Sequence, residues 1–138
     1  MSKLIFPAAP APTLAIAGSD DRIPVQRVFC VGRNYEEHAK EMGQQVERDE
    51  PFYFTKSNEA VVADGSTIPY ASATTNYHYE FELAVVIGAP AFRVSKEEAL
   101  SKVYGYACAL DMTRRDLQLM KRAKQLPWLS LIHISEPT

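Results

Sequence analysis

The sequence predicts an α+β fold that is mostly β, with a few short helices. Apolar runs rich in Val, Ile, Tyr and Phe recur along the chain, which is typical of strands. The helical segments between them are short and do not alternate regularly with the strands, as they would in a doubly wound sheet. The 138 residues are 46% hydrophobic and 23% charged, which fits one soluble globular domain.

Two strands and one helix are predicted in the N-terminal half. Residues 25–32 form a compact apolar run that ends in glycine, and residues 52–56 form a second short run, so both are predicted strands. Residues 34–42 between them are rich in helix-forming side chains and are followed by a glycine. Residues 1–22 contain several prolines that interrupt the apolar stretch, so we expect an irregular leader segment and no signal peptide.

The C-terminal half is predicted to contain two longer strands, each followed by a helix. Residues 77–88 and 103–110 are the predicted strands. Residues 95–101 begin with a Ser-x-x-Glu capping sequence and form a short helix. A second helix is predicted over residues 114–125, with Thr113 as its cap and Asp116 completing a Thr-x-x-Asp start.

Three carboxylates stand in or directly after these apolar runs: Glu80, Glu82 and Asp111. Residues two apart on a strand point to the same side, so Glu80 and Glu82 project together. Burying a carboxylate is costly unless something neutralises it, and no Lys or Arg is equally placed, so a bound divalent cation is predicted. Oxygen ligands favour Mg²⁺ or Mn²⁺ over Zn²⁺. The simpler alternative is a solvent-facing strand side, with Asp111 starting a turn.

Two histidines lie close to acidic residues. His38 and Glu41 are three residues apart, on one face of the predicted helix, where a surface pair is the simpler interpretation. His78 falls on the same side of its strand as Glu80 and either supports the metal ligands or is a plain hydrogen-bonded histidine.

Composition excludes several classes of function. The formal net charge is −2 and no stripe of Lys or Arg is present, which disfavours nucleic-acid binding. No apolar run is long enough to span a bilayer, so we expect a cytoplasmic protein without membrane partners. Cys30 and Cys108 lie in apolar runs without metal-ligand spacing, and we expect them to be small buried side chains.

Four segments, in order, resemble the fumarylacetoacetate hydrolase family: CVGRNYEEHAKEMG (30–43), FTKS (54–57), NYHYEFELAVVIG (76–88) and YGYACALDMTRRDLQ (104–118). The likeness covers residues 23–128, and NYHYEFEL and DMTRRDLQ are most similar to the members that act on fumarylpyruvate in aromatic-acid (gentisate) degradation. It implies a mixed β-sheet roll with short helices and a metal-dependent hydrolysis of a carbon–carbon bond in a 2,4-dioxo acid, giving fumarate and pyruvate from fumarylpyruvate.

The resemblance also implies roles for particular residues. The positions that match the family's metal ligands, which would hold Mg²⁺ or Mn²⁺, are Glu80, Glu82 and Asp111. His38 matches the catalytic base that takes a proton from water, and Glu41 matches the carboxylate that orients it. The substrate-binding positions are matched by Arg33, Lys56, Arg115 and Gln118. Arg114 is left without a role, since a pair of solvated arginines at a helix start is common.

Three segments are therefore expected: a leader (1–22), a catalytic domain that is incomplete at its C-terminus (23–128), and a tail (129–138). The tail, LSLIHISEPT, departs from the family's pattern. It can be back-translated as a transposase end joined to a sequencing adapter, so we expect it to be read-through from adapter DNA. The chain by itself is then expected to be inactive, and the full-length protein is expected to be a homodimer that binds a small dicarbonyl acid.

The sequence leaves alternative functions open. Acylpyruvate hydrolases, oxaloacetate decarboxylases and dienedioate isomerases share the three metal ligands within the family. A non-catalytic module that binds a metal or a partner through a partial fold is the alternative from a different class.

Overall fold

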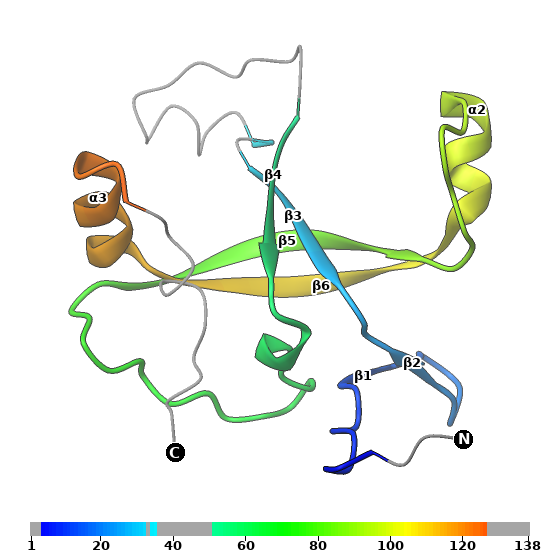
Figure 1. Ribbon diagram of the computed structural model, residues 1–138, viewed down its shortest axis with the longest axis horizontal. Helices are drawn as coiled ribbons and strands as arrows, with labels where there is room; N and C mark the ends of the chain where they lie inside the picture. The colour runs from blue at the N-terminus through cyan, green and yellow to red at the C-terminus, as the bar shows by residue number, and fades with distance from the viewer. Residues whose placement is uncertain (1–3, 33, 36–50, 127–138) are drawn as a thin grey trace. The chain divides into compact units, whose positions relative to one another are not determined.

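The computed structural model describes residues 4–32, 34–35 and 51–126, and these fall into two compact units that meet in the chain at Pro69 and Tyr70 (Figure 1). Both units consist mainly of strands with short helices, so the predicted mostly β fold is confirmed. Each strand pair among the described residues is antiparallel.

The first unit begins with a small hairpin. Strand β1 (Thr13–Ala15) pairs with β2 (Arg22–Pro24), and Gly18 in the turn has a φ of 76°, which glycine adopts without strain. The Arg22 side chain crosses the pair and donates to Thr13 Oγ1 at 2.7 Å. The expectation of an irregular segment over residues 1–22 is therefore wrong for β1 and for the first residue of β2. Strands of three residues are too short to give a sequence pattern.

A second strand pair also lies in the first unit. Strand β3 (Val28–Gly32) lies antiparallel to β4 (Phe52–Lys56), which has the predicted bounds, and a short 3₁₀ helix, η1 (Asn58–Ala60), follows. The Asn58 side chain donates to the carbonyl of Val25 at 3.1 Å and so links η1 to the start of the predicted strand 25–32. The predicted helix over 34–42 lies almost entirely outside the described residues.

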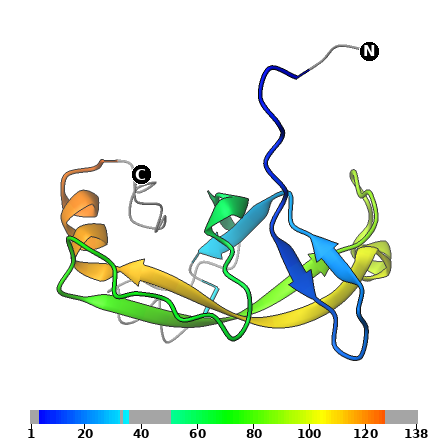
Figure 2. The ribbon, with the colours of Figure 1, turned by 90° about the horizontal axis from the view of Figure 1, so that it is seen from below.

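The second unit is built on a long two-stranded ribbon. Strand β5 (Tyr77–Ile87) pairs with β6 (Val103–Arg114), and the chain between them contains α2 (Lys96–Ala99) and the 3₁₀ helix η2 (Leu100–Lys102). Helix α3 (Arg115–Ala123) begins directly after β6. Figures 1 and 2 show α2 and α3 at opposite ends of the ribbon. Strand β6 continues past its predicted end at residue 110, so Asp111 lies within the strand.

The two helices begin in different ways. Helix α2 has the predicted capping box, in which Ser95 Oγ accepts from Glu98 N at 3.2 Å and the Glu98 carboxylate accepts from Ser95 N. Thr113 does not cap α3: it is buried within β6, and Arg114 in the capping position makes no side-chain bond to the helix. Within the described residues no helix has the length and apolar character needed to cross a bilayer.

The two sides of the ribbon differ in chemistry. Successive residues of β5 point to opposite sides, and Phe81 and Leu83 are 68% and 61% exposed, whereas the Glu80 side chain is only 20% exposed. The alternative of a solvent-facing acidic side is therefore wrong for Glu80, and Asp111 lies within β6 and does not start a turn. We call the other side the apolar face, and it consists of Tyr79, Phe81, Leu83, Val85, Ile87, Tyr106 and Leu110.

Few apolar side chains are buried. Among the described residues the only fully buried hydrophobic side chain is Ala71, and the buried polar side chains are Thr113 and Arg115. Cys30 is half-buried, but Cys108 is exposed beside the apolar face, so the expectation of a buried side chain is wrong for Cys108. The described part of the chain therefore has almost no hydrophobic core of its own.

Candidate active site

The pairing of β5 with β6 brings the three predicted metal ligands to one side of the ribbon. Glu80 lies directly opposite Asp111, and Glu82 lies opposite Ala109, diagonal to Asp111. Side chains directly opposite one another on one side of an antiparallel pair have Cβ atoms about 5 Å apart, and diagonal neighbours are about 7 Å apart, still within reach of long side chains. We call this side, defined by Glu80, Glu82 and Asp111, the acidic face.

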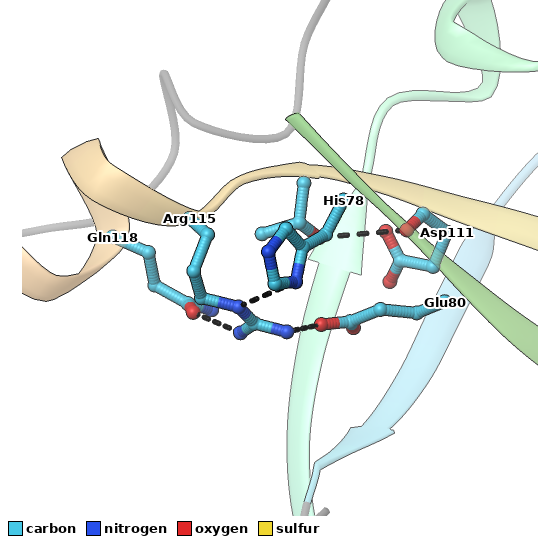
Figure 3. Close-up of polar contacts among 6 residues, drawn as sticks. His78, Glu80, Asp111, Arg115 and Gln118 are labelled. Atoms are coloured by element: carbon cyan, nitrogen blue, oxygen red, sulfur yellow. Dashed lines mark hydrogen bonds and ion pairs between the residues drawn. The ribbon is translucent and has the colours of Figure 1, made fainter. Parts of the chain in front are cut away.

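Arg115 reaches back over the acidic face from the start of α3 (Figure 3). Its guanidinium makes an ion pair with Glu80 Oε1 through Nη2, donates to Gln118 Oε1 through Nη1, and donates to His78 Nδ1 through Nε at 3.4 Å. The residue is only 7% exposed. The expectation that no Lys or Arg is placed to neutralise these carboxylates is therefore wrong for Glu80.

The same contacts place two further side chains. Gln118 lies one helical turn after Arg115, so the predicted sharing of one helix face by these two residues agrees with the structure. His78 contacts Arg115 with Nδ1 as the acceptor, which puts His78 on the same side as Glu80. At 3.4 Å the bond from Arg115 to His78 is a weak one.

The first turn of α3 is also attached to the chain before β5. The backbone N–H of Arg115 donates to the carbonyl of Asn76 at 2.9 Å. The carboxylate of Asp116 accepts from Thr74 Oγ1 at 2.5 Å, from Thr75 N at 2.9 Å and from Leu117 N at 2.9 Å. The hydrogen bond from Thr74 and those from the Thr75 and Leu117 backbone lower the pKa of Asp116 from 3.8 to about 2.

The sequence did not reveal this attachment. Asp116 was expected only to complete a capping sequence that begins at Thr113, whereas its partners Thr74 and Thr75 lie more than forty positions earlier in the chain. A carboxylate that binds a distant loop leaves no periodic pattern in the sequence. The only available signal was the pair of threonines directly before Asn76, and threonines are common in turns.

The other predicted site residues are placed differently. Lys56 is the last residue of β4 and belongs to the first unit, whereas Glu80, Glu82, Asp111, Arg115 and Gln118 belong to the second. Arg33, His38 and Glu41 lie outside the described residues. Within the second unit, the structure places the predicted metal ligands on one side of the ribbon together with Arg115 and Gln118.

A metal ion needs several ligands converging on one point. Within residues 4–32, 34–35 and 51–126, no group of three or more His, Cys, Asp or Glu side chains is arranged closely enough to hold one. The donors of the acidic face are nevertheless the right kind, because carboxylate oxygens are the preferred ligands of Mg²⁺ and Mn²⁺. One of these carboxylates, that of Glu80, is paired with the chain's own Arg115.

The arrangement defines a class of site. Carboxylates on one strand pair can hold a cation, and an arginine beside them can bind an anion through its planar fork of N–H groups. A cation and an anionic substrate next to each other are the elements of metal-assisted chemistry on an organic acid.

Comparison with known proteins identifies the family. Residues 27–133 match the model for the C-terminal domain of fumarylacetoacetate (FAA) hydrolase, so the chain belongs to this family, as its motifs predicted. The fumarylpyruvate hydrolase of Ralstonia sp is 53% identical over 89 residues, which are 63% of this chain and 46% of that protein. The mitochondrial oxaloacetate tautomerase FAHD1 of Arabidopsis thaliana is 44% identical over 102 residues, or 74% of this chain and 45% of that one.

A solved structure shows the same fold. The crystal structure of fumarylpyruvate hydrolase from Pseudomonas aeruginosa, in complex with Mn²⁺ and pyruvate, is similar with a TM-score of 0.83 and 49% sequence identity. The similarity covers 91% of this chain and 56% of that one. The chain spans about half the length of the relatives that it matches.

Proposed function

We propose that this chain forms part of a metal-dependent hydrolase that cleaves a carbon–carbon bond in a 2,4-dioxo acid. The proposed substrate is fumarylpyruvate and the products are fumarate and pyruvate. The observation that supports this best is the acidic face itself, in which Glu80 and Asp111 are cross-strand partners bordered by Arg115. The similarity to the fumarylpyruvate hydrolases of Ralstonia sp and Pseudomonas aeruginosa supports the substrate.

Glu80, Glu82 and Asp111 are proposed to hold Mg²⁺ or Mn²⁺. When bound, such an ion polarises the oxygens of a 2-oxo acid and stabilises negative charge that develops on them. The relative from Pseudomonas aeruginosa was crystallised with Mn²⁺ and pyruvate, which supports both the type of ion and the type of ligand. Glu80 must exchange its ion pair with Arg115 for the ion, or share its two oxygens between them.

Arg115 and Gln118 are proposed to bind the substrate. A guanidinium can bind a carboxylate through two parallel hydrogen bonds, and Arg115 already lies beside the acidic face. Gln118 accepts from Arg115 through Oε1, which leaves its amide N–H groups able to donate to the substrate. Arg33 and Lys56 are proposed to bind the remaining carboxylate through their positive charges.

His38 is proposed as the general base, oriented by Glu41. It takes a proton from the water whose oxygen attacks the carbonyl carbon at position 4, and the bond between carbons 3 and 4 then breaks. The acyl part leaves as fumarate, and the electron pair of the broken bond remains on the pyruvate part, which takes up a proton. Histidine suits this role because its ordinary pKa lies near neutral pH.

The test is a comparison of substrates on the complete product of the gene that encodes this chain. Turnover of fumarylpyruvate, acetylpyruvate and oxaloacetate is measured with Mg²⁺ or Mn²⁺ and with a chelator. We expect fumarylpyruvate to give the highest kcat/KM, activity to disappear with the chelator, and either ion to restore it. If fumarylpyruvate is the poorest of the three substrates, the proposed substrate is wrong. Activity that survives the chelator would exclude the proposed metal dependence.

A second activity is favoured by a separate observation. Several relatives that align over more of this chain than the Ralstonia protein are oxaloacetate tautomerases, among them the Arabidopsis thaliana protein. Oxaloacetate is also a 2-oxo acid with two carboxylates, so the acidic face and Arg115 suit it as well. A kcat/KM that is highest for oxaloacetate, read as tautomerisation or decarboxylation in the same assay, would favour this activity.

The proposal includes the state of the complete protein. We expect a cytoplasmic homodimer that binds a small dicarbonyl acid. Light scattering of the purified protein and fractionation of its cells measure these two properties, and a monomer or a membrane-bound protein would contradict them.

A further inference from the structure

The start of α3 depends on contacts outside the helix. It is a helix of nine residues, and Arg114 in the capping position makes no side-chain bond to it. Isolated helices shorter than about 12 residues are marginal in water, so the direction of α3 must be fixed by its surroundings. The direct anchors at its first turn are the carboxylate of Asp116 on Thr74 and Thr75, and the backbone N–H of Arg115 on Asn76.

These anchors connect the two strands of the acidic face at one end. Asn76 directly precedes β5, which contains Glu80, and Arg115 directly follows β6, which contains Asp111. Both anchors attach the start of α3 to the segment directly before β5. They therefore fix the helix start beside the strand whose Glu80 the Arg115 guanidinium contacts.

Asp116 itself points away from the acidic face. Neighbouring residues on a helix project about 100° apart, so Asp116 and Arg115 cannot face the same partner. Arg115 contacts Glu80 and His78, whereas the carboxylate of Asp116 contacts Thr74 and Thr75.

We propose that Asp116 is a positioning residue, which holds the Arg115 guanidinium at the acidic face for binding of the substrate's carboxylate. Thr74 is its principal partner, with the shortest of its hydrogen bonds. This inference rests on the proposed function, because it requires that Arg115 binds the substrate. Asp116 remains ionised at every pH near neutrality, since its pKa is lowered to about 2, so its hydrogen bonds to the loop are charge-assisted.

The experiment measures equilibrium binding of 2-oxoglutarate to the complete gene product with saturating Mn²⁺. This ligand has a 2-oxo acid and a second carboxylate but no ketone at position 4, so it cannot undergo the proposed cleavage. Calorimetry gives its Kd for the wild type, for Asp116→Asn, for Arg115→Gln and for the double variant. The Kd of Mn²⁺ alone and the melting temperature are measured for each protein.

The expected pattern is a loss that depends on Arg115. Arg115→Gln removes a charged hydrogen-bond donor and should raise the Kd of 2-oxoglutarate about 30-fold. Asp116→Asn should raise this Kd about 10-fold. The loss of affinity is smaller because this substitution only displaces Arg115. In the Arg115→Gln background, Asp116→Asn has less than about a twofold further effect, since two residues that act through one contact are not additive. The Kd of Mn²⁺ stays within about twofold throughout.

Two further variants complete the test. Thr74→Val removes the shortest hydrogen bond without changing any charge or much of the side-chain shape, and we expect a smaller loss of about 3-fold. If Asp116→Asn fails to fold, Thr74→Val tests the same contact. Glu97→Gln is the matched control, because Glu97 is an acidic residue in the first turn of α2, at the other end of the ribbon, and we expect no change in Kd.

The possible failures are distinct. If Arg115→Gln leaves the Kd of 2-oxoglutarate unchanged, the proposed substrate role of Arg115 is wrong and Asp116 has nothing to position. If Arg115→Gln weakens binding but Asp116→Asn and Thr74→Val do not, only the positioning role is wrong. Losses that add up in the double variant, or an equal loss of Mn²⁺ affinity, would also overturn the positioning role.

Discussion

Arg115 is the residue on which most of the described site converges. It is buried, and its three kinds of N–H group contact His78, Glu80 and Gln118. Breaking a buried ion pair by removing one partner leaves the other charge uncompensated, which costs far more than the pair contributes. Arg115 therefore neutralises Glu80 in this structure, and it is also the residue proposed to bind the substrate.

A conservative change at this position separates charge from shape. Arg115→Lys keeps the positive charge but loses the planar fork, so we expect kcat/KM for the preferred substrate to fall by about 10-fold or more. Steady-state kinetics of the complete gene product measure this loss. Arg114→Lys is the control, because Arg114 lies next to it but has no proposed role. Equal losses in the two variants would contradict the assignment.

The lowered pKa of Asp116 predicts that the stability of the protein decreases at acid pH. The pKa of this carboxyl is 3.8 when it is unperturbed and about 2 in the folded chain, so folding favours the ionised form. Its contribution to stability is therefore complete above about pH 4, decreases as the pH falls through 3.8, and is gone below about 2. Urea unfolding between pH 5 and pH 2 should show this decrease in the wild type of the complete gene product.

The comparison that isolates this residue is Asp116→Asn. An amide does not titrate, so the part of the acid-induced loss that belongs to Asp116 should be absent from the variant, and the two stability curves should converge toward low pH. Curves that stay parallel down to pH 2 would show that Asp116 does not titrate in this range.

At the scale of elements, two glycines at one end of the β5–β6 ribbon differ in the space available for a side chain. A Cβ added to Gly88 would lie 2.7 Å from the Cβ of Tyr104 and 3.4 Å from its Cα, so the β6 backbone would have to move. At Gly105 a Cβ meets nothing within 4 Å. We expect Gly88→Ala to lower the free energy of unfolding by about 1–3 kcal/mol. Gly105→Ala should be neutral or slightly stabilising, by up to about 1 kcal/mol.

Urea unfolding of the complete gene product carrying each substitution checks this pair. Both glycines lie at the same end of the ribbon and lack a positive φ, so the difference between them reports the close approach to Tyr104 alone. Equal effects of the two substitutions would mean that the ends of β5 and β6 can separate without cost.

The strands show how far the sequence alone could predict this structure. The bounds of β4 and the capping box of α2 follow from local residue preferences, and both were predicted. The common side of Glu80 and Glu82 follows from the twofold period of a strand. These features need no knowledge of distant parts of the chain.

The remaining features depend on pairing between distant segments. Strand β6 extends to Arg114 because its last residues pair with Tyr77 and His78, and Asp111 becomes a partner of Glu80 only through that register. The contact of Arg115 with Glu80 then depends on where β6 ends and on the direction of α3. Neither can be read from local preference, which is why the counter-charge of Glu80 was missed.

At the scale of the whole molecule, the distribution of apolar side chains stands out. The apolar face of the ribbon is exposed along its length, and the described residues bury only Ala71 among their hydrophobic side chains. Contiguous exposed apolar surface of this kind promotes association with other apolar surfaces. The chain of residues 1–138, expressed by itself, should therefore bind a hydrophobic dye and self-associate.

Two phenylalanines test whether the apolar face is responsible. Phe81 lies in the middle of it, whereas Phe92 lies in the loop before α2 and is even more exposed, at 84% against 68%. We expect Phe81→Lys to reduce dye fluorescence and light scattering strongly, and Phe92→Lys to have little effect, because scattered apolar residues are ordinary on surfaces. The reverse order would show that exposure of single residues matters more than a continuous face.

The pairing of β5 also determines where this protein can change in length. Residues 77–86 pair one-to-one with β6, and a residue gained or lost among them would turn every later side chain to the opposite side, exchanging carboxylates with aromatic rings. Between Val86 and Ile87 the register already shifts, since Val86 pairs with Gly105 and Ile87 with Val103. An extra residue inserted there would find Tyr104 as a partner and leave the acidic face as it is. Natural relatives that differ in length along this hairpin should therefore differ beyond Val86, at the end away from Arg115.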